Sequence, residues 1–199
     1  LAGAVPSSRG TDLVAALVGA VGVAPRVWLE PRGTWEVRLL DNGQAPLVGL
    51  LRRRPGPARL LLRQNAHMVD TRTGQYLGAR RELAIPDSET REVLVYTLLP
   101  TTPGELAIGP KAGKLGQDVT IALKLPGGLQ ASRIVRVRVT DSQGQERWAY
   151  RRYLHMTGTQ GEVTIPLAYN DPVGRWRIEM TDISTGARNT AHFDVSAGG

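Results

Sequence analysis

Hydrophobic and polar residues alternate with a period of two along most of the chain, which indicates half-buried β-strands. In the N-terminal half this alternation predicts short strands, at residues 27–30, 35–40, 45–53, 58–63, 66–70, 75–85 and 91–98. The run Asp41-Asn42-Gly43 lies between two of them, and Asn-Gly is a strong hairpin signal. Short strands separated by turns predict a sandwich or a barrel.

The C-terminal half alternates more regularly. Its apolar positions recur on every second residue within 119–125, 135–139, 163–167, 176–180 and 191–195, and the residues between them are largely polar or charged. One buried and one solvated face are typical of an antiparallel sandwich, and six or seven strands over about 90 residues suit an immunoglobulin-like module. A strand over residues 145–156 belongs to the same set, with Trp148, Tyr150, Leu154 and Met156 on its apolar side.

A different pattern precedes the first strand. Thr11 and Asp12 suit a helix N-terminus, apolar residues at helical spacing follow, and Gly22 and Pro25 end the pattern. The linker-like run 100–104 divides the chain at residues 1–102 and 103–199. The predicted fold class is therefore mainly β, with two tandem antiparallel immunoglobulin-like β-sandwich modules and one short N-terminal helix.

The first residue of the 199 is Leu, and we expect the chain to be part of a longer protein. The longest apolar stretch, 13–23, is too short to span a bilayer, so no membrane partner is expected. The chain contains no cysteine, which excludes disulfides and zinc–thiolate sites but leaves the compartment open, whether extracellular or cytoplasmic.

The chain is basic, with a net charge of +7 and an isoelectric point of about 10.3. Only three of its 25 basic residues are lysines. A basic surface can attract nucleic acid, an acidic polysaccharide or an acidic neighbouring domain. No recognition helix or base-stacking motif is present, so specific binding of nucleic acid is not expected.

No catalytic or metal site emerges from the residues. The three histidines, His67, His155 and His192, lie on different predicted strands without a second ligand at a suitable spacing. The run 109–115 departs from a phosphate loop in spacing, and no Gly-x-Ser-x-Gly elbow or pair of carboxylates stands out. We therefore expect no cofactor, no metal and no enzymatic activity in this chain.

Aromatic and arginine residues supply the candidate binding site. Trp35, Trp148 and Trp176 are in phase with apolar positions and are predicted to be buried, whereas Trp28 is out of phase and either exposed or packed against the helix. Arginines occupy the polar phase of three strands, together with Tyr153. The candidate residues are Trp28, Arg136, Arg138, Arg147, Arg151, Tyr153, Arg175 and Arg177.

The six arginines are predicted to share one face of one sheet. Arginine pairs bidentately with carboxylate, phosphate or sulfate groups, so such a face can bind a polyanion. A solvated charged face, or one covered by a neighbouring domain, is the alternative.

One turn pattern, Asp-x-x-Thr-Gly, occurs in both halves, at residues 70–74 and 182–186. Aspartate can accept a hydrogen bond from a backbone amide two residues on, and glycine supplies a positive φ, so both runs predict hairpin turns.

The run from His67 to Gly78, followed by Leu98-Leu99-Pro100, resembles a module in the C-terminal part of bacterial β-galactosidase-like glycoside hydrolases. The run 22–25 is similar to the end of a glutamine-amidotransferase-like domain in such proteins, and 170–172, Gly174, Trp176 and the turn at Asp182 resemble immunoglobulin-like or macroglobulin-like sandwiches. Met68-Val69 departs from the usual Val-Tyr. The catalytic glutamates of such enzymes lie outside these residues.

The resemblance implies a non-catalytic accessory region of a larger glycoside-hydrolase-like protein, acting in domain packing or oligomer assembly. Its partners would be neighbouring domains of the same chain. A carbohydrate-binding or polyanion-binding module is the alternative, and a hydrolase hidden in the fold is a third hypothesis.

Overall fold

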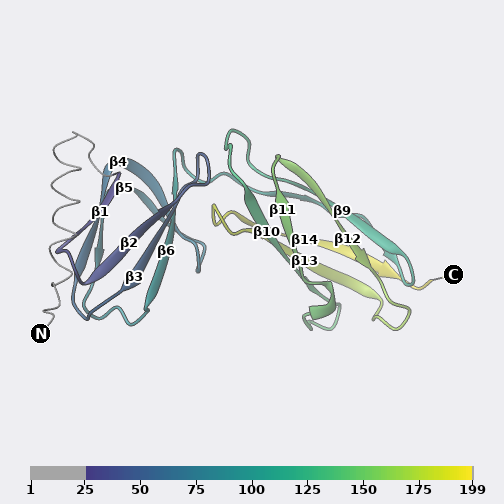
Figure 1. Ribbon diagram of the computed structural model, residues 1–199. Coiled ribbons are helices and arrows are strands. Elements are labelled where there is room, and N and C mark those ends of the chain that lie inside the picture. Colours follow the sequence, from purple (N-terminus) through teal and green to yellow (C-terminus); the bar gives the residue numbers. More distant parts are fainter. Residues whose placement is uncertain (1–25, 199) are drawn as a thin grey trace, which may run out of the picture.

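The structure is a computed structural model that describes residues 26–198, and its regular elements are β-strands apart from one short 3₁₀ helix (Figure 1). The sheets are antiparallel in a barrel-like arrangement, which is consistent with a β-sandwich and confirms the expectation of a mainly β fold. The predicted N-terminal helix lies outside the described residues. Within 26–198, no helix is both long enough and apolar enough for a membrane span.

One six-stranded sheet forms the N-terminal half. Its strands are β1 (Val27–Glu30), β2 (Trp35–Leu40), β3 (Leu47–Arg52), β4 (Ala58–Asp70), β5 (Gln75–Ile85) and β6 (Val93–Leu99). Their order is β1-β4-β6-β3-β2, with β5 paired to the other side of β4. The hairpin predicted at Asp41-Asn42-Gly43 is confirmed, because β2 and β3 are antiparallel neighbours.

The long strand β4 allows this sheet to curve around its core. Its first part pairs with β1 and its last part with β6, while β5 follows it along both. The separate strands predicted at 58–63 and 66–70 are thus one strand with a shift of register between Leu61 and Ala66. Residues from β1 to β6 enclose one hydrophobic cluster, which includes Trp35 as predicted.

Two facing sheets form the C-terminal half. The larger has the order β11-β10-β13-β14-β8 and the smaller the order β12-β9-β7. Their strands are β7 (Ala107–Gly109), β8 (Gly113–Lys114), β9 (Asp118–Lys124), β10 (Arg133–Thr140), β11 (Arg152–Met156), β12 (Gln160–Pro166), β13 (Gly174–Asp182) and β14 (Arg188–Ser196). Every pair is antiparallel except β8 with β14.

Side chains from both of these sheets enclose a second hydrophobic cluster. Trp176 is fully buried at its centre, with the rings of Tyr150 and Phe193 at centroid distances of 6.1 and 6.0 Å. The predicted inward phase of β13 is therefore confirmed.

The strand predicted over residues 145–156 is wrong in its first half. The 3₁₀ helix η1 (Trp148–Tyr150) interrupts it, and β11 begins only at Arg152. The three-residue turn removes the period of two, so Trp148 is 67% exposed although Tyr150 is buried. The hydroxyl of Tyr150 donates a hydrogen bond to the carboxylate of Asp171, which holds the turn against the end of the sheets.

Candidate functional site

Two surfaces contain the residues of interest, and the first is the junction between the halves. Both halves present a hairpin turn there: the Asp70 turn (70–74) joins β4 to β5, and the Asp182 turn (182–186) joins β13 to β14 (Figure 1). In each turn the aspartate carbonyl accepts a hydrogen bond from the glycine nitrogen, at 2.8 and 2.9 Å. The glycines have φ of +72° and +71°, a conformation that favours glycine. Both hairpin predictions are confirmed.

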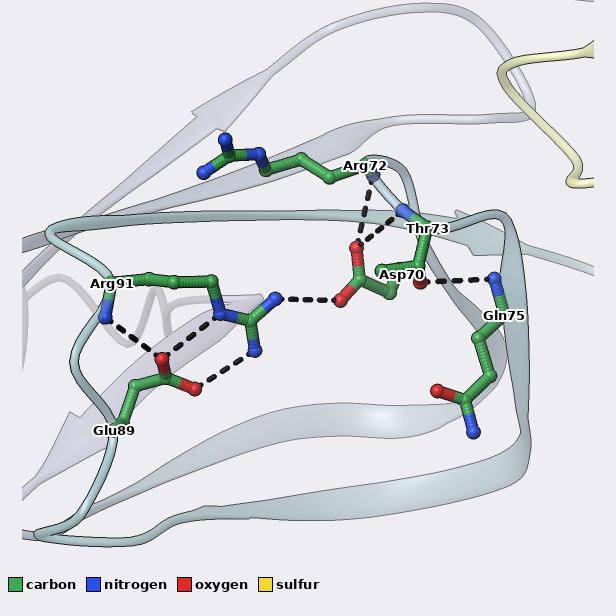
Figure 2. Close-up of polar contacts among 6 residues, drawn as sticks. All are labelled: Asp70, Arg72, Thr73, Gln75, Glu89 and Arg91. Atoms are coloured by element: carbon green, nitrogen blue, oxygen red, sulfur yellow. Dashed lines mark hydrogen bonds and ion pairs between the residues drawn. The ribbon is translucent and has the colours of Figure 1, made fainter.

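In the Asp70 turn an arginine binds the aspartate from outside the turn (Figure 2). Oδ1 of Asp70 accepts hydrogen bonds from the nitrogens of Arg72 and Thr73 at 2.9 and 3.2 Å, and Oδ2 accepts one from Arg91 at 3.1 Å. Arg91 also donates to Glu89 at 2.8 and 2.9 Å. These bonds lower the pKa of Glu89 to about 2 and raise that of Arg91.

In the Asp182 turn the corresponding arginine is buried. Arg133, at the start of β10, is 2% exposed and Asp182 is fully buried. Oδ2 of Asp182 accepts hydrogen bonds from Nε of Arg133 at 2.7 Å and from the hydroxyl of Thr185 at 2.6 Å, and Nη2 of Arg133 forms an ion pair with it. Nη1 of Arg133 donates to the carbonyl of Pro126 at 3.0 Å. The buried guanidinium of Arg133 therefore binds Asp182 through one part and the carbonyl of Pro126 through another.

Arg133 is absent from the residues predicted to matter from the sequence. Its position carried a signal, because Arg133 shares the inward phase of β10 with Val135. An arginine on a buried phase needs a partner.

The two turns contact each other across the junction. A Cβ added at Gly186 would overlap the carbonyl oxygen of Gly74, so the backbones approach closely there. A third hydrophobic cluster consists of Ala45, Val69 and Leu99 from the N-terminal half, and Leu129 and Ala131 from the C-terminal half pack against it.

Four hydrogen bonds join the β2–β3 loop to the segment before β10. Asn42 and Ser132 form a reciprocal pair: the amide of Asn42 donates to the carbonyl of Ser132 at 3.0 Å, and the nitrogen of Ser132 donates to Oδ1 of Asn42 at 3.1 Å. Gln44 and Gln130 form a second pair, at 2.9 and 3.0 Å. The junction is thus bonded through backbone as well as side chains, which restricts movement of one half against the other.

The second surface is the outer face of the larger C-terminal sheet. Arg136 and Arg138 on β10 and Arg175 and Arg177 on β13 alternate with buried residues, so all four lie on this face. Arg138 is opposite Glu179 across the two strands. These four predicted residues are therefore on one side of one sheet.

The other two predicted arginines lie beside η1 and differ in their partners. Arg151 pairs with Glu146, which also pairs with Arg138 on the sheet face. These two arginines lower the pKa of Glu146 to about 2, mainly through the hydrogen bond from Arg138. Arg147 instead pairs with the buried carboxylate of Asp141 at 2.7 Å, and it lies just before η1, outside the strands of the sheet.

The two aromatic candidates, Trp28 and Tyr153, lie in different halves of the chain, and the structure exposes a third ring, that of Trp148. Trp28 is half-buried on β1, and its Nε1 donates to Glu30 at 3.4 Å. Tyr153 is 60% exposed on β11, directly opposite Arg136. Trp148, which was predicted to be in the core, is exposed, and the guanidinium of Arg151 lies 3.7 Å from its ring centroid.

Candidate groups for metal binding or acid–base chemistry are dispersed. Within 26–198, no three His, Cys, Asp or Glu side chains converge as metal ligands. Nδ1 of His67 lies 2.6 Å from the hydroxyl of Tyr76, and Nε2 of His155 lies 2.5 Å from that of Ser132. The carboxyls of Glu89 and Glu146 have pKa values of about 2, so both are ionised near neutral pH and neither can supply a proton there.

Comparison of the chain with protein-family models and with curated proteins finds no match.

Proposed function

We propose that this chain is a non-catalytic accessory region of a larger protein, which holds two β modules in a fixed relative orientation. One observation carries the proposal: equivalent turns from the two halves contact each other, and four hydrogen bonds join the β2–β3 loop to the segment before β10. A flexible tether between independent modules would need none of these contacts. The resemblance to β-galactosidase-like glycoside hydrolases suggests which kind of protein it belongs to.

We propose that the two modules meet between residues 102 and 103 and that the C-terminal half is an immunoglobulin-like β-sandwich. Its two facing sheets around a buried Trp176 support that assignment. The partners would be neighbouring domains of the parent chain or further copies of it, against which the fixed pair of modules packs.

Spin-label distance measurements test the fixed orientation. Because the chain has no cysteine, labels can be attached only where Cys is introduced, for example by Ser88→Cys in the N-terminal half and Gln143→Cys in the other. Both positions are exposed and lie in turns. We expect a narrow distribution of distances between the labels, and a broad one would overturn the proposal.

A matched pair of variants assigns the rigidity to the junction. Asn42→Ala removes the reciprocal bonds to Ser132 and should broaden the distribution. Asn65→Ala makes the same change at an exposed position on β4 and should leave the distribution narrow. The non-catalytic part has its own test, because hydrolysis of glycosidase or esterase substrates by the isolated chain would contradict it.

A further inference from the structure

The indole of Trp148 is an exposed aromatic ring whose orientation is fixed. The guanidinium of Arg151 lies over one ring face at 3.7 Å from the centroid, and yet the residue is 67% exposed. A guanidinium covers only one face of an indole, so a second flat or apolar surface can stack on the other. The arrangement offers a stacking surface that needs little ordering when a ligand binds.

A network of ion pairs holds Arg151 in this position. Glu146 binds Arg151 and Arg138 together, and Arg138 also pairs with Glu179 at 3.7 Å. The network ties η1 to the neighbouring strands β10 and β13. Rigid support of this kind reduces the entropy cost of binding.

A second exposed ring, that of Tyr153, shares a face with Arg151. Arg151 is extended and Tyr153 follows two residues later on β11, so their side chains share one face at a spacing of about 7 Å. Tyr153 is 60% exposed, and Arg136 lies directly opposite it on β10. Tyr153 and Arg136 are thereby placed side by side at the edge of one sheet, on the same face as Arg151, which lies over the ring of Trp148.

Arg136, unlike Arg138 and Arg151, has no carboxylate partner among the described residues. Within the described residues Arg136, Arg175 and Arg177 form no ion pair, whereas Arg138 and Arg151 do. The arginines of this face outnumber its carboxylates, so the free charge favours an anionic ligand.

We propose that Trp148, Tyr153 and Arg136 form a binding site for an acidic polysaccharide. The rings stack on the apolar faces of successive sugar rings, and Arg136 binds a carboxylate or sulfate group through paired hydrogen bonds. Arg175 and Arg177 extend the positive charge along β13 for the rest of the ligand. This site does not depend on the junction, so it can fail while the proposed fixed orientation holds.

Single-stranded nucleic acid is less suited to the same surface. Bases also stack on aromatic rings, but such binding requires a positively charged groove that follows the phosphates. Arg151, which lies over the ring of Trp148, and Arg138 on β10 are already paired with Glu146. Sugar rings with one anionic group each fit the remaining charge better.

Titration calorimetry with the full chain tests the site. Heparin and polygalacturonate are the charged probes, which separate sulfate from carboxylate recognition, and dextran is the neutral control. We expect binding to at least one charged probe and weaker binding to dextran. No binding to either charged probe, or equal binding to dextran, would overturn the proposal, as would tighter binding of a single-stranded oligonucleotide.

Two pairs of variants distinguish binding at the proposed site from attraction to the net charge of the chain. Trp148→Ala should weaken binding about tenfold or more, which corresponds to about 1.4 kcal/mol. Tyr169→Ala removes an aromatic ring that is 82% exposed and lies beside Gly116, away from this face, and should have no effect. Arg136→Gln should weaken binding similarly, whereas Arg54→Gln makes the same charge change on an exposed loop of the N-terminal half and should not.

Fluorescence gives a second readout, which reports on the tryptophan at the proposed site. Ligand should change the tryptophan emission of the wild-type chain, and this change should vanish in Trp148→Ala while Trp28→Ala retains it. Equal losses of affinity in Arg136→Gln and Arg54→Gln would show that overall charge holds the polyanion, and the proposed site would then be wrong.

Discussion

The backbones of Gly186 and Gly74 touch, although the two residues belong to hairpins in different halves of the chain. A Cβ at Gly186 would overlap the carbonyl oxygen of Gly74, while a Cβ at Gly74 would lie 3.6 Å from Cα of Gly186, an ordinary contact. Both glycines have the same left-handed φ. The pair therefore separates the cost of backbone strain from the cost of opening the junction.

Alanine at these two positions should destabilise the protein to different extents. Gly74→Ala introduces only left-handed strain, which costs about 1–2 kcal/mol. Gly186→Ala adds a clash with the other half, so its loss of unfolding free energy should be larger by about 1 kcal/mol or more. Urea denaturation measures both, and equal losses would mean that the turns do not contact each other in solution.

Removal of the buried carboxylate at Asp182 should be severe. Asp182→Ala leaves the buried guanidinium of Arg133 without its counter-charge, and breaking a buried pair in this way costs about 3–5 kcal/mol. Asp70→Ala is the matched change in the other turn, where the side chain of Arg91 is 37% exposed and can turn to water. The thermal midpoint of Asp70→Ala should fall less than that of Asp182→Ala. A greater fall in Asp70→Ala would contradict the difference in burial between the two ion pairs.

Substitutions of adjacent residues on β13 should change the stability by very different amounts. Trp176→Ala empties the centre of the C-terminal core and should cost about 3–5 kcal/mol. Arg177→Ala changes an exposed side chain and should alter the unfolding free energy by less than about 1 kcal/mol. Equal denaturation midpoints for the two variants would show that the assignment of Trp176 to the inward face and Arg177 to the outward face is wrong.

Acid should weaken the fold through Glu146. Folding lowers its pKa from 4.5 to about 2, so the stabilisation is complete above pH 4.5 and is lost as the pH falls through 2. The urea midpoint of the wild-type chain should decline across this window, and Glu146→Gln should decline less steeply. Glu162→Gln, at an exposed position on β12, is the control and should keep the wild-type slope.

Much of the fold follows from the period of two, because strands with one solvated face carry that pattern directly. The inward phase of β13, the hairpin at Asn42 and both Asp-x-x-Thr-Gly turns were predictable on this basis. Residues 145–156 were not, since the bond from Tyr150 to Asp171 that accompanies η1 joins segments distant in sequence. The misplaced phase put Trp148 in the core and hid the exposed ring.

The contacts between elements were harder to predict from the sequence. Six arginines on the polar phase predicted a charged face, and four of them lie on it, but pairing with Glu146 or Asp141 depends on how η1 folds back. The aspartate turns were visible as a repeated pattern. Their contact depends on the relative placement of two cores, which no local pattern encodes.

Strand β8, the short parallel neighbour of β14, affects how the C-terminal half responds to mechanical force. Tension between the junction and residue 196 would act on the N-terminal end of β8 and on the C-terminal end of β14. In a parallel pair these two ends point in opposite directions, so the strands would be pulled past each other along their shared axis. The bonds between them, including that from Leu115 to Ser196 at 3.0 Å, would then be sheared together instead of opening one at a time. The C-terminal half should therefore resist stretching along this axis better than an antiparallel hairpin pulled open from its ends.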